Sequence, residues 1–317
     1  MSVFHSLINA IIVIVLIYAL AILLRSRNVL AEEHSLTLAR IVTDLCLPAM
    51  IFVTMAKLSI HPDELVPALV MLGLELTCIA LAWIIAVFLK YERAQQGAIV
   101  FCSAFGSSTF LGYAIVMQIF PDNPQVLGQT VLISEIGVGY PIFILGPMLA
   151  AYFGSKHSDL KSQWKSCFVF FKSPVFFALI IGILWGSFGL PGKENVFTAP
   201  VFQLGHVLSS ALTPLAILSV GLMFRVPDLK SILATLTIVI VIKLITKPLF
   251  AVLISDQLGF PEIWEQILVL LSAMPPAVLG VVFLKRYGGD ARLASALLLG
   301  ASIVSVITVL MVFRLIT

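Results

Sequence analysis

Ten long apolar segments follow one another along the chain and leave few folds open to it. A helix that crosses a bilayer needs about 20 mainly apolar residues. Lipid offers no partner for backbone polar groups, so such segments cross as helices. We therefore expect an all-α polytopic membrane protein with ten transmembrane helices, at residues 4–24, 38–57, 64–89, 94–119, 126–153, 172–190, 198–224, 229–254, 261–284 and 292–316.

Composition supports a chain that lies in lipid. Charged residues make up 11% of the sequence and hydrophobic residues 60%, whereas soluble domains carry about 25% charged residues. The expected partner is thus the lipid bilayer and not nucleic acid. The first segment begins near Met1 without a basic stretch before it, which indicates a retained helix and not a signal peptide. The four cysteines have no metal-ligand spacing, so no metal site is expected.

Basic residues gather on one side of the predicted hairpins. That side holds Arg25, Arg27, Arg40, Lys90, Arg93, Lys156, Lys161, Lys165, Lys172, Arg225, Lys230, Lys285, Arg286 and Arg292. The opposite side holds only Lys57, Lys193 and Arg314. Because loops rich in Lys and Arg stay in the cytoplasm, we expect a multi-pass protein of the cytoplasmic (inner) membrane with both termini outside.

Similar landmarks recur in the two halves of the chain. Leu47-Pro48 in the second span corresponds to Thr213-Pro214 in the seventh, 166 residues later, and Ser103-Ala104 to Ser272-Ala273, 169 residues later. The spacing predicts two five-helix repeats, residues 1–153 and 172–317, joined by a cytoplasmic linker at 154–171. An odd number of helices inserts the second repeat upside down.

The fourth and ninth spans carry residues that interrupt helices. Pro275-Pro276 removes two backbone donors and clashes with the preceding turn, and the Gly106-Ser107-Ser108-Thr109 stretch indicates a similar break. Freed carbonyls at membrane depth need protein or a watery cavity around them. Interrupted segments at matching places in two halves point to the binding site of a secondary transporter. Pro48 and Pro214 are either packing kinks or hinges.

Several sequence pieces, in order and spacing, resemble one known family over essentially the whole chain. They are Leu47-Pro48-Ala49-Met50-Ile51-Phe52, Phe110-Leu111-Gly112-Tyr113, Lys243-Leu244 with Pro248-Leu249, and Tyr287-Gly288-Gly289-Asp290 followed by Ala294-Ser295, Ser302, Ser305 and Thr308. The chain thereby resembles the auxin efflux carrier family in its short bacterial form, which is related in fold to bile acid/sodium symporter-like carriers.

The resemblance carries expectations and two departures. It implies two inverted repeats, crossed broken helices in spans four and nine, and elevator-type transport of organic anions. Short bacterial relatives are linked to malate or malonate, and plant relatives to auxin. Ser107, Ser108 and Thr109 stand where relatives usually have Asn-Thr-Gly, and Ala114 stands where they usually have proline.

Five ionisable residues fall inside predicted spans, where each charge needs a partner or a function. They are Asp44, Glu75, Glu135, Lys243 and Lys247. At ~1.5 Å per residue, Lys243 and Glu135 differ by only about 5 Å in depth, which favours a structural pair. Lys243 as countercharge for an anionic substrate, and Asp44 or Glu135 as coupling site for H⁺ or Na⁺, remain open. Glu75 is protonated or faces another helix, and Lys247 can extend to the outer surface.

These features predict a carrier for a small mono- or dicarboxylate. Broken helices point positive N-terminal ends into the membrane interior, where a carboxylate can bind free N–H groups. Hydroxyls of Ser107, Ser108 and Thr109 would add donors, and the substrate's apolar part would lie against Met274, Pro275 and Pro276. The crossing helices would then move as a body relative to spans two and seven.

Other functions remain as alternatives. A cation/proton antiporter would need acidic residues at the interruptions, and spans four and nine have none there. A transport-inactive ligand sensor of the same fold is the second alternative. The chain has no HExxH motif, so we expect no enzyme and no cofactor beyond a coupling ion. Gly-rich lipid faces leave the oligomeric state open, a homodimer included.

Overall fold

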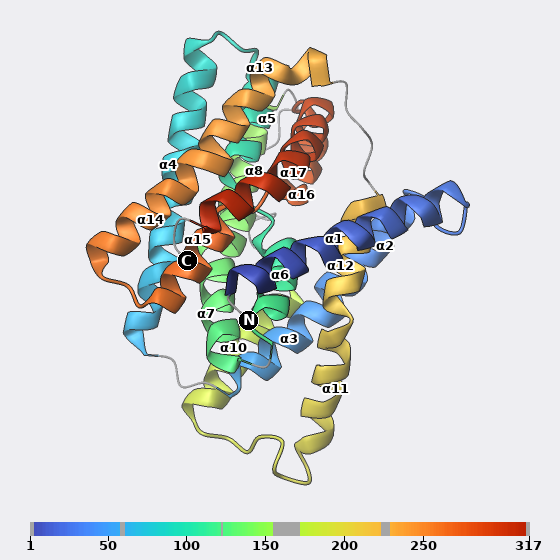
Figure 1. The fold of residues 1–317 in the computed structure, drawn as a ribbon, viewed down its shortest axis with the longest axis vertical. Coiled ribbons are helices and arrows are strands. Elements are labelled where there is room, and N and C mark those ends of the chain that lie inside the picture. Colours follow the sequence, from blue (N-terminus) through green and yellow to red (C-terminus); the bar gives the residue numbers. More distant parts are fainter. Residues whose placement is uncertain (1–2, 58–60, 122, 155–171, 223–228, 315–317) are drawn as a thin grey trace. The chain divides into compact units, whose positions relative to one another are not determined.

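The computed structural model describes residues 3–57, 61–121, 123–154, 172–222 and 229–314, which form helices and one isolated β-bridge (Figure 1). The predicted linker lies outside these residues except for Gly154, as does Arg225. The α-helices are α1 (Val3–Ser26), α2 (His34–Ile41), α3 (Leu47–Met55), α4 (Val66–Phe88), α5 (Arg93–Ala104), α6 (Tyr113–Ile119), α7 (Pro124–Ser134), α8 (Tyr140–Phe153), α10 (Pro174–Ser187), α11 (Ala199–Ser210), α12 (Leu212–Leu222), α13 (Leu229–Val239), α14 (Lys247–Leu258), α15 (Glu262–Ser272), α16 (Val278–Tyr287) and α17 (Ala291–Phe313). A short 3₁₀-helix, η2, covers Pro62–Leu65.

Among the described residues, 7 helices are long and apolar enough to cross a membrane. They correspond to predicted spans one, two, three, five, seven, eight and ten. The predicted spans four and nine are each divided into two shorter helices. The predicted span six contains α10, a helix of 14 residues.

The chain separates into two compact units, each built from non-contiguous segments. The first unit comprises Met1–Glu64, Tyr113–Val131 and Phe171–Phe224, and the second comprises Leu65–Gly112, Leu132–Phe170 and Arg225–Thr317. The first unit therefore holds predicted spans one, two, six and seven, and the second holds spans three, eight, nine and ten with parts of four and five.

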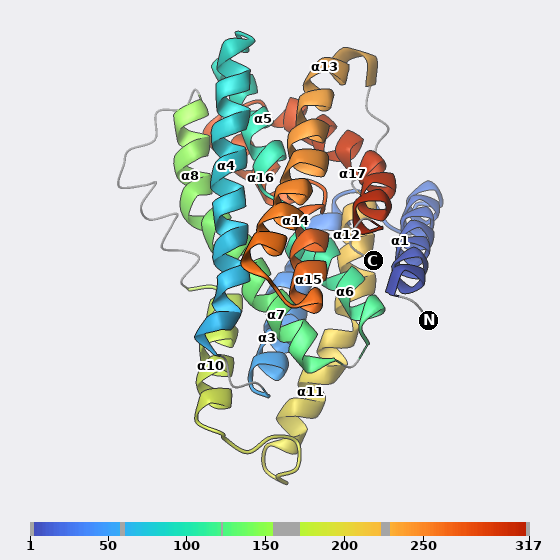
Figure 2. The same ribbon diagram turned by 60° about the vertical axis from the view of Figure 1, so that its left-hand side comes forward.

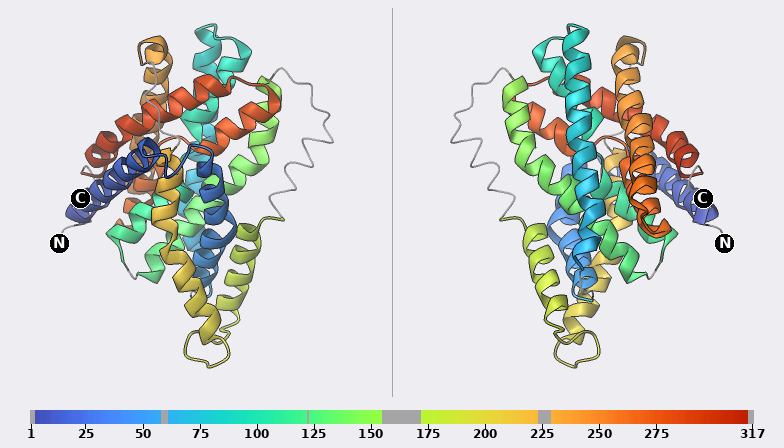
Figure 3. Two further views of the ribbon diagram at one scale, coloured as in Figure 1. Left: turned by 90° about the vertical axis from the view of Figure 1, so that its right-hand side faces the viewer. Right: turned by 90° about the vertical axis from the view of Figure 1, so that its left-hand side faces the viewer.

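In the first unit, α3 packs beside α10 and α11, and α12 packs against α1 and α2 (Figure 3). Small residues permit these close approaches. A Cβ on Gly205 of α11 would lie 2.3 Å from Val53 of α3, and one on Gly221 of α12 would lie 2.7 Å from Ala21 of α1. Backbones that approach at small residues are typical of helix packing in membranes.

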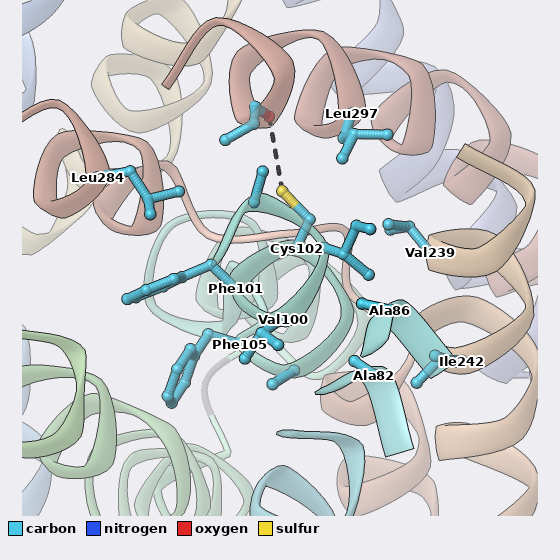
Figure 4. Close-up of a cluster of buried hydrophobic side chains, with 14 of the residues drawn as sticks. Ala82, Ala86, Val100, Phe101, Cys102, Phe105, Val239, Ile242, Leu284 and Leu297 are labelled. Atoms are coloured by element: carbon cyan, nitrogen blue, oxygen red, sulfur yellow. Dashed lines mark hydrogen bonds between the residues drawn. The ribbon is translucent and has the colours of Figure 1, made fainter. Parts of the chain in front are cut away.

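In the second unit, α5 lies in a shell of neighbouring helices that includes α4, α8 and α17 (Figure 2). Phe101, Cys102 and Phe105 of the α5 segment point into the apolar core of this unit (Figure 4). The Cys102 thiol donates to the Ala294 carbonyl at 3.5 Å, which ties α5 to α17. The last turn of α5 is thus held on several sides where the helix ends.

At four places in the described part of the chain, a wide π-helical turn immediately precedes an α-helix. These turns are η1 (Val42–Cys46), η3 (Ser108–Gly112), η4 (Glu135–Gly139) and η5 (Ile240–Thr246). In three of them the second residue of the following helix is proline, at Pro48, Pro141 and Pro248, and after η3 it is Ala114. Proline cannot donate to the preceding turn and clashes with a carbonyl four residues back, which favours a widened turn. Such turns occur frequently at functional sites.

Candidate functional site

Two broken helices meet at their interruptions in the second unit. The α5 helix ends at Ala104 and the next helical turn begins at Ser108, while α15 ends at Ser272 and α16 begins at Val278. An antiparallel bridge joins Gly106 to Pro276. The Ser107 N–H donates to the Pro275 carbonyl at 2.7 Å, and the Ala277 N–H donates to the Phe105 carbonyl at 2.9 Å. The two interruptions therefore satisfy part of each other's backbone, and both interruptions predicted from sequence are present.

A new helix begins after each interruption, so the N-terminal end of that helix lies at the interruption. In the helix 108–119, the first donors with backbone partners are Leu111 and Gly112, which both bond the Ser107 carbonyl at 3.0 and 3.1 Å. The N–H groups of Ser108 and Thr109 precede these bonds. The α16 helix starts after Ala277, which offers no side-chain cap. Each free N-terminus acts as roughly half a positive charge, so two such ends lie at the joined interruptions.

Two buried lysines of one helix bond the opposite ends of the broken helices. Lys247 donates to the carbonyl of Ala104, the last residue of α5, at 3.1 Å. Lys243 donates to the carbonyl of Ser272, the last residue of α15, at 3.4 Å. A cation at a helix C-terminus is favourable because it opposes the negative end of the dipole. Both lysine side chains are fully buried, and each bonds a backbone carbonyl at the end of one broken helix.

The buried ion pair differs from the predicted one. Lys247 contacts Glu75 with 2.6 Å between Nζ and Oε1, and both side chains are fully buried. The expectation that Lys247 extends to the outer surface was therefore wrong. Among the described residues no ion pair between Lys243 and Glu135 is found, and the Lys243 amine bonds the Ser272 carbonyl. The alternative that Glu75 faces another helix is correct, and that helix is α14.

Glycine at position 106 allows Lys243 to reach the interruption. A Cβ at Gly106 would lie 2.8 Å from the Lys243 Nζ and 3.6 Å from the Met274 carbonyl. Met274, Pro275 and Pro276 are buried in the same stretch. The structure thus brings Lys243 and Met274 beside the bridged residues Gly106 and Pro276.

Hydroxyl groups lie at the start of the helix 108–119. Ser107 and Ser108 are buried, and Thr109 is half-buried. The Ser134 hydroxyl, at the end of α7, donates to the Ser108 hydroxyl at 2.8 Å. The Thr109 and Ser134 hydroxyl oxygens are 3.4 Å apart. Ser134 was not predicted, because a single serine in an apolar span has no sequence signal that distinguishes it from a packing residue.

The remaining predicted residues lie elsewhere or have other neighbours. Asp44 is exposed in η1 of the first unit, where its carboxylate accepts from the Thr43 hydroxyl at 3.2 Å. Pro48 is the second residue after η1, and Pro214 lies in the first turn of α12, just after the helix is interrupted at Ala211. Glu135 is buried at the first residue of η4. Asp44, Pro48 and Pro214 thus belong to the first unit, and the residues of the two interruptions belong to the second.

Comparison with known proteins places the whole chain in one family. Residues 6–313 match the model of the family described as "Membrane transport protein". An "Uncharacterized transporter" of Methanothermobacter thermautotrophicus is 27% identical over 299 residues, 93% of each chain. The "Uncharacterized transporter YfdV" of Escherichia coli is 24% identical over 282 residues, 85% of each chain. A "Putative malonate transporter" of Rhizobium meliloti is 26% identical over 283 residues, 84% of this chain and 82% of the relative. The protein therefore belongs to the membrane transport protein family that contains the auxin efflux carriers, and it is a multi-pass membrane transporter.

Proposed function

We propose that this transporter carries a small organic anion, a mono- or dicarboxylate, and binds it at the joined interruptions of the second unit. One observation carries the proposal. Two helix N-termini, the buried hydroxyls of Ser107 and Ser108, and the Lys243 amino group lie together at the bridge between Gly106 and Pro276. Every one of these groups donates hydrogen bonds or carries positive charge, which suits a carboxylate.

Different residues would bind different parts of the anion. Free N–H groups of the helix 108–119 and of α16 would bond the carboxylate oxygens, and Ser107, Ser108 and Thr109 would add side-chain donors. Lys243 would supply the countercharge, because its buried amino group, which bonds the Ser272 carbonyl, would gain a charged hydrogen-bond partner from a bound anion. Met274, Pro275 and Pro276 would contact the apolar part of the substrate. The relative named as a putative malonate transporter supports a dicarboxylate as the first substrate to test.

Transport would proceed by elevator-type alternating access, in which the second unit moves relative to the first. The division of contacts into two compact units supports this mechanism. The interrupted helices meet within the second unit, so a bound anion would travel with it. Pro48 and Pro214 would serve as hinges in the first unit, and Asp44 or Glu135 would bind a coupling H⁺ or Na⁺.

The arrangement in the membrane is also part of the proposal. Ten spans would form two inverted repeats, residues 1–153 and 172–317, with the linker 154–171 in the cytoplasm. The distribution of Lys and Arg supports both termini outside the inner membrane. The structure offers no carboxylate within the interrupted stretches 105–107 and 273–277, and Glu75 is paired to Lys247. Anion transport is therefore favoured over cation/proton antiport.

The test is uptake of labelled malonate, malate and an indole carboxylate into proteoliposomes, with H⁺ and Na⁺ gradients imposed separately. We expect saturable uptake of one of these anions, and the gradient that accelerates it identifies the coupling ion. Protein-free vesicles are the control. Folded protein that exchanges H⁺ or Na⁺ without carrying any anion would contradict the proposal and favour an antiporter. Folded protein that binds an anion without moving it would favour a sensor.

A further inference from the structure

Three hydroxyl groups form a chain next to the interrupted part of the fourth span. Ser134, the last residue of α7, donates to Ser108 at 2.8 Å, and the Thr109 and Ser134 oxygens are 3.4 Å apart. Ser108 and Ser134 are fully buried. These contacts join the end of α7 to the first turn of the helix 108–119, where backbone N–H groups precede the first intrahelical bonds.

Counting the hydroxyl hydrogens gives a direction to the row of hydrogen bonds through these three residues. A hydroxyl has one hydrogen to donate and two lone pairs to accept. Ser134 donates its only hydrogen to Ser108, so in the contact with Thr109 it must accept. Thr109 then donates to Ser134, and of these three hydroxyls only that of Ser108 has a hydrogen with no acceptor among the described residues. The chain therefore ends in a donor at the N-terminal end of a helix.

We propose that Ser134 is a positioning residue for the transported anion, because it orients Ser108 to donate to a substrate carboxylate. This inference rests on the proposed function and adds a residue of the fifth span to it. Successive hydrogen bonds polarise one another in a buried environment, so the Ser108 donor is strengthened by the two hydroxyls behind it. A charged acceptor benefits most, which favours an ionised carboxylate over the protonated acid or an amide.

A purely structural role for Ser134 makes different predictions. If the hydroxyl only joined α7 to the helix 108–119, its loss would lower the stability of the protein and leave its affinity for the substrate unchanged. If it orients Ser108, its loss raises KM while kcat and the melting temperature change little. A double-mutant cycle also separates the two roles. If Ser134 acts through Ser108, its removal has no further effect on KM once the Ser108 hydroxyl is gone.

The experiment compares Ser134→Ala, Ser108→Ala and the double variant in malonate uptake by proteoliposomes, or in uptake of whichever carboxylate the wild type carries. We expect Ser134→Ala to raise KM about tenfold, Ser108→Ala to raise it at least as much, and the double variant to match Ser108→Ala. Ser134→Thr, which keeps the hydroxyl, should restore most of the affinity.

A matched control lies one turn earlier in the same helix. The Thr130 hydroxyl is also fully buried but donates to the Val126 carbonyl of its own helix at 2.6 Å, so Thr130→Val should leave KM unchanged. A KM for Ser134→Ala within twofold of the wild type, or additive effects of the two alanines, would overturn the inference while the carrier function stands. A wild type that carries no carboxylate would instead remove the proposed function itself.

Discussion

Gly106 and Lys243 occupy adjoining space, and each limits what the other can be. A Cβ on residue 106 would lie 2.8 Å from the Lys243 Nζ. A Cβ and the Nζ cannot occupy these positions together. The obstructing atom is the end of a flexible side chain, so it can move without unfolding the backbone. Lys243 would then leave the carbonyl of Ser272 at the end of α15.

We predict that Gly106→Ala folds but transports poorly. The displaced ammonium would no longer face the interruption, so KM for the carried anion should rise about tenfold or more, while the melting temperature falls by only a few degrees. Gly73→Ala is the control, because no atom lies within 4 Å of its Cβ position and alanine is the better helix former. Equal uptake kinetics of the two variants would show that Lys243 does not need this space.

The Glu75–Lys247 pair matters for stability at the residue scale. Both side chains are fully buried, and the second carboxylate oxygen, Oε2, has no hydrogen-bond partner among the described residues. A buried ion pair adds little by itself, but removing one partner leaves a charge stranded in a medium that solvates it poorly.

Either Glu75→Gln or Lys247→Met alone should therefore lower the free energy of unfolding by about 3–5 kcal/mol. The double variant should recover most of that loss, since neither member of the pair then leaves the other without its countercharge. Chemical or thermal denaturation in detergent measures the cycle. The partly exposed pair Arg25–Glu32, with 3.7 Å between the charged atoms, is the comparison, and breaking it by Glu32→Gln should change stability by less than about 1 kcal/mol. Losses of equal size at the two pairs would contradict the argument.

At the scale of elements, the two interruptions were visible in the sequence because glycine, serine and paired prolines are unfavourable in an apolar helix. The ion pairing was not visible. A rise of ~1.5 Å per residue gives depth along a helix, and depth alone favoured Lys243 with Glu135. The face that a side chain occupies turns by about 100° with each residue, so every π-helical turn shifts the following residues around the axis. Lys243 lies inside η5 and Glu135 inside η4, where this shift cannot be read from spacing.

Replacing Pro275 and Pro276 together by alanine tests the interruption of span nine. Alanine restores both N–H groups, so α15 can extend beyond Ser272 and compete with the bridge to Gly106. We expect a folded, membrane-inserted protein with little transport. Pro67→Ala is the control, since Pro67 is the second residue of α4, where the missing N–H costs nothing. Near-normal uptake by the double alanine variant would show that the interruption is not needed.

At the scale of the molecule, length and composition predicted the helical class, and among the described residues 7 helices are long enough to cross a membrane in one piece. Half-helices of 10 to 12 residues, such as α5, α15 and α16, look like full spans in a sequence because their apolar residues run on through the break. The predicted repeat divides the chain near its middle, whereas contacts divide it into interleaved units. Periodicity along a chain reports which segments are alike, and packing energy decides which of them associate.

The interleaving has a consequence for how the protein is made. Glu75 and Lys247 are 172 residues apart in the chain, and ribosomes add about 5–20 residues per second, so roughly 10 to 35 seconds separate their synthesis. During that interval α4 carries a carboxyl group whose countercharge has not yet been made. It must hold a proton or stay near water or the insertion machinery, because an ionised carboxylate in lipid costs about 3 kcal/mol or more. A chain that stops before residue 247 therefore keeps this carboxyl group without the lysine that pairs with it in the full-length protein.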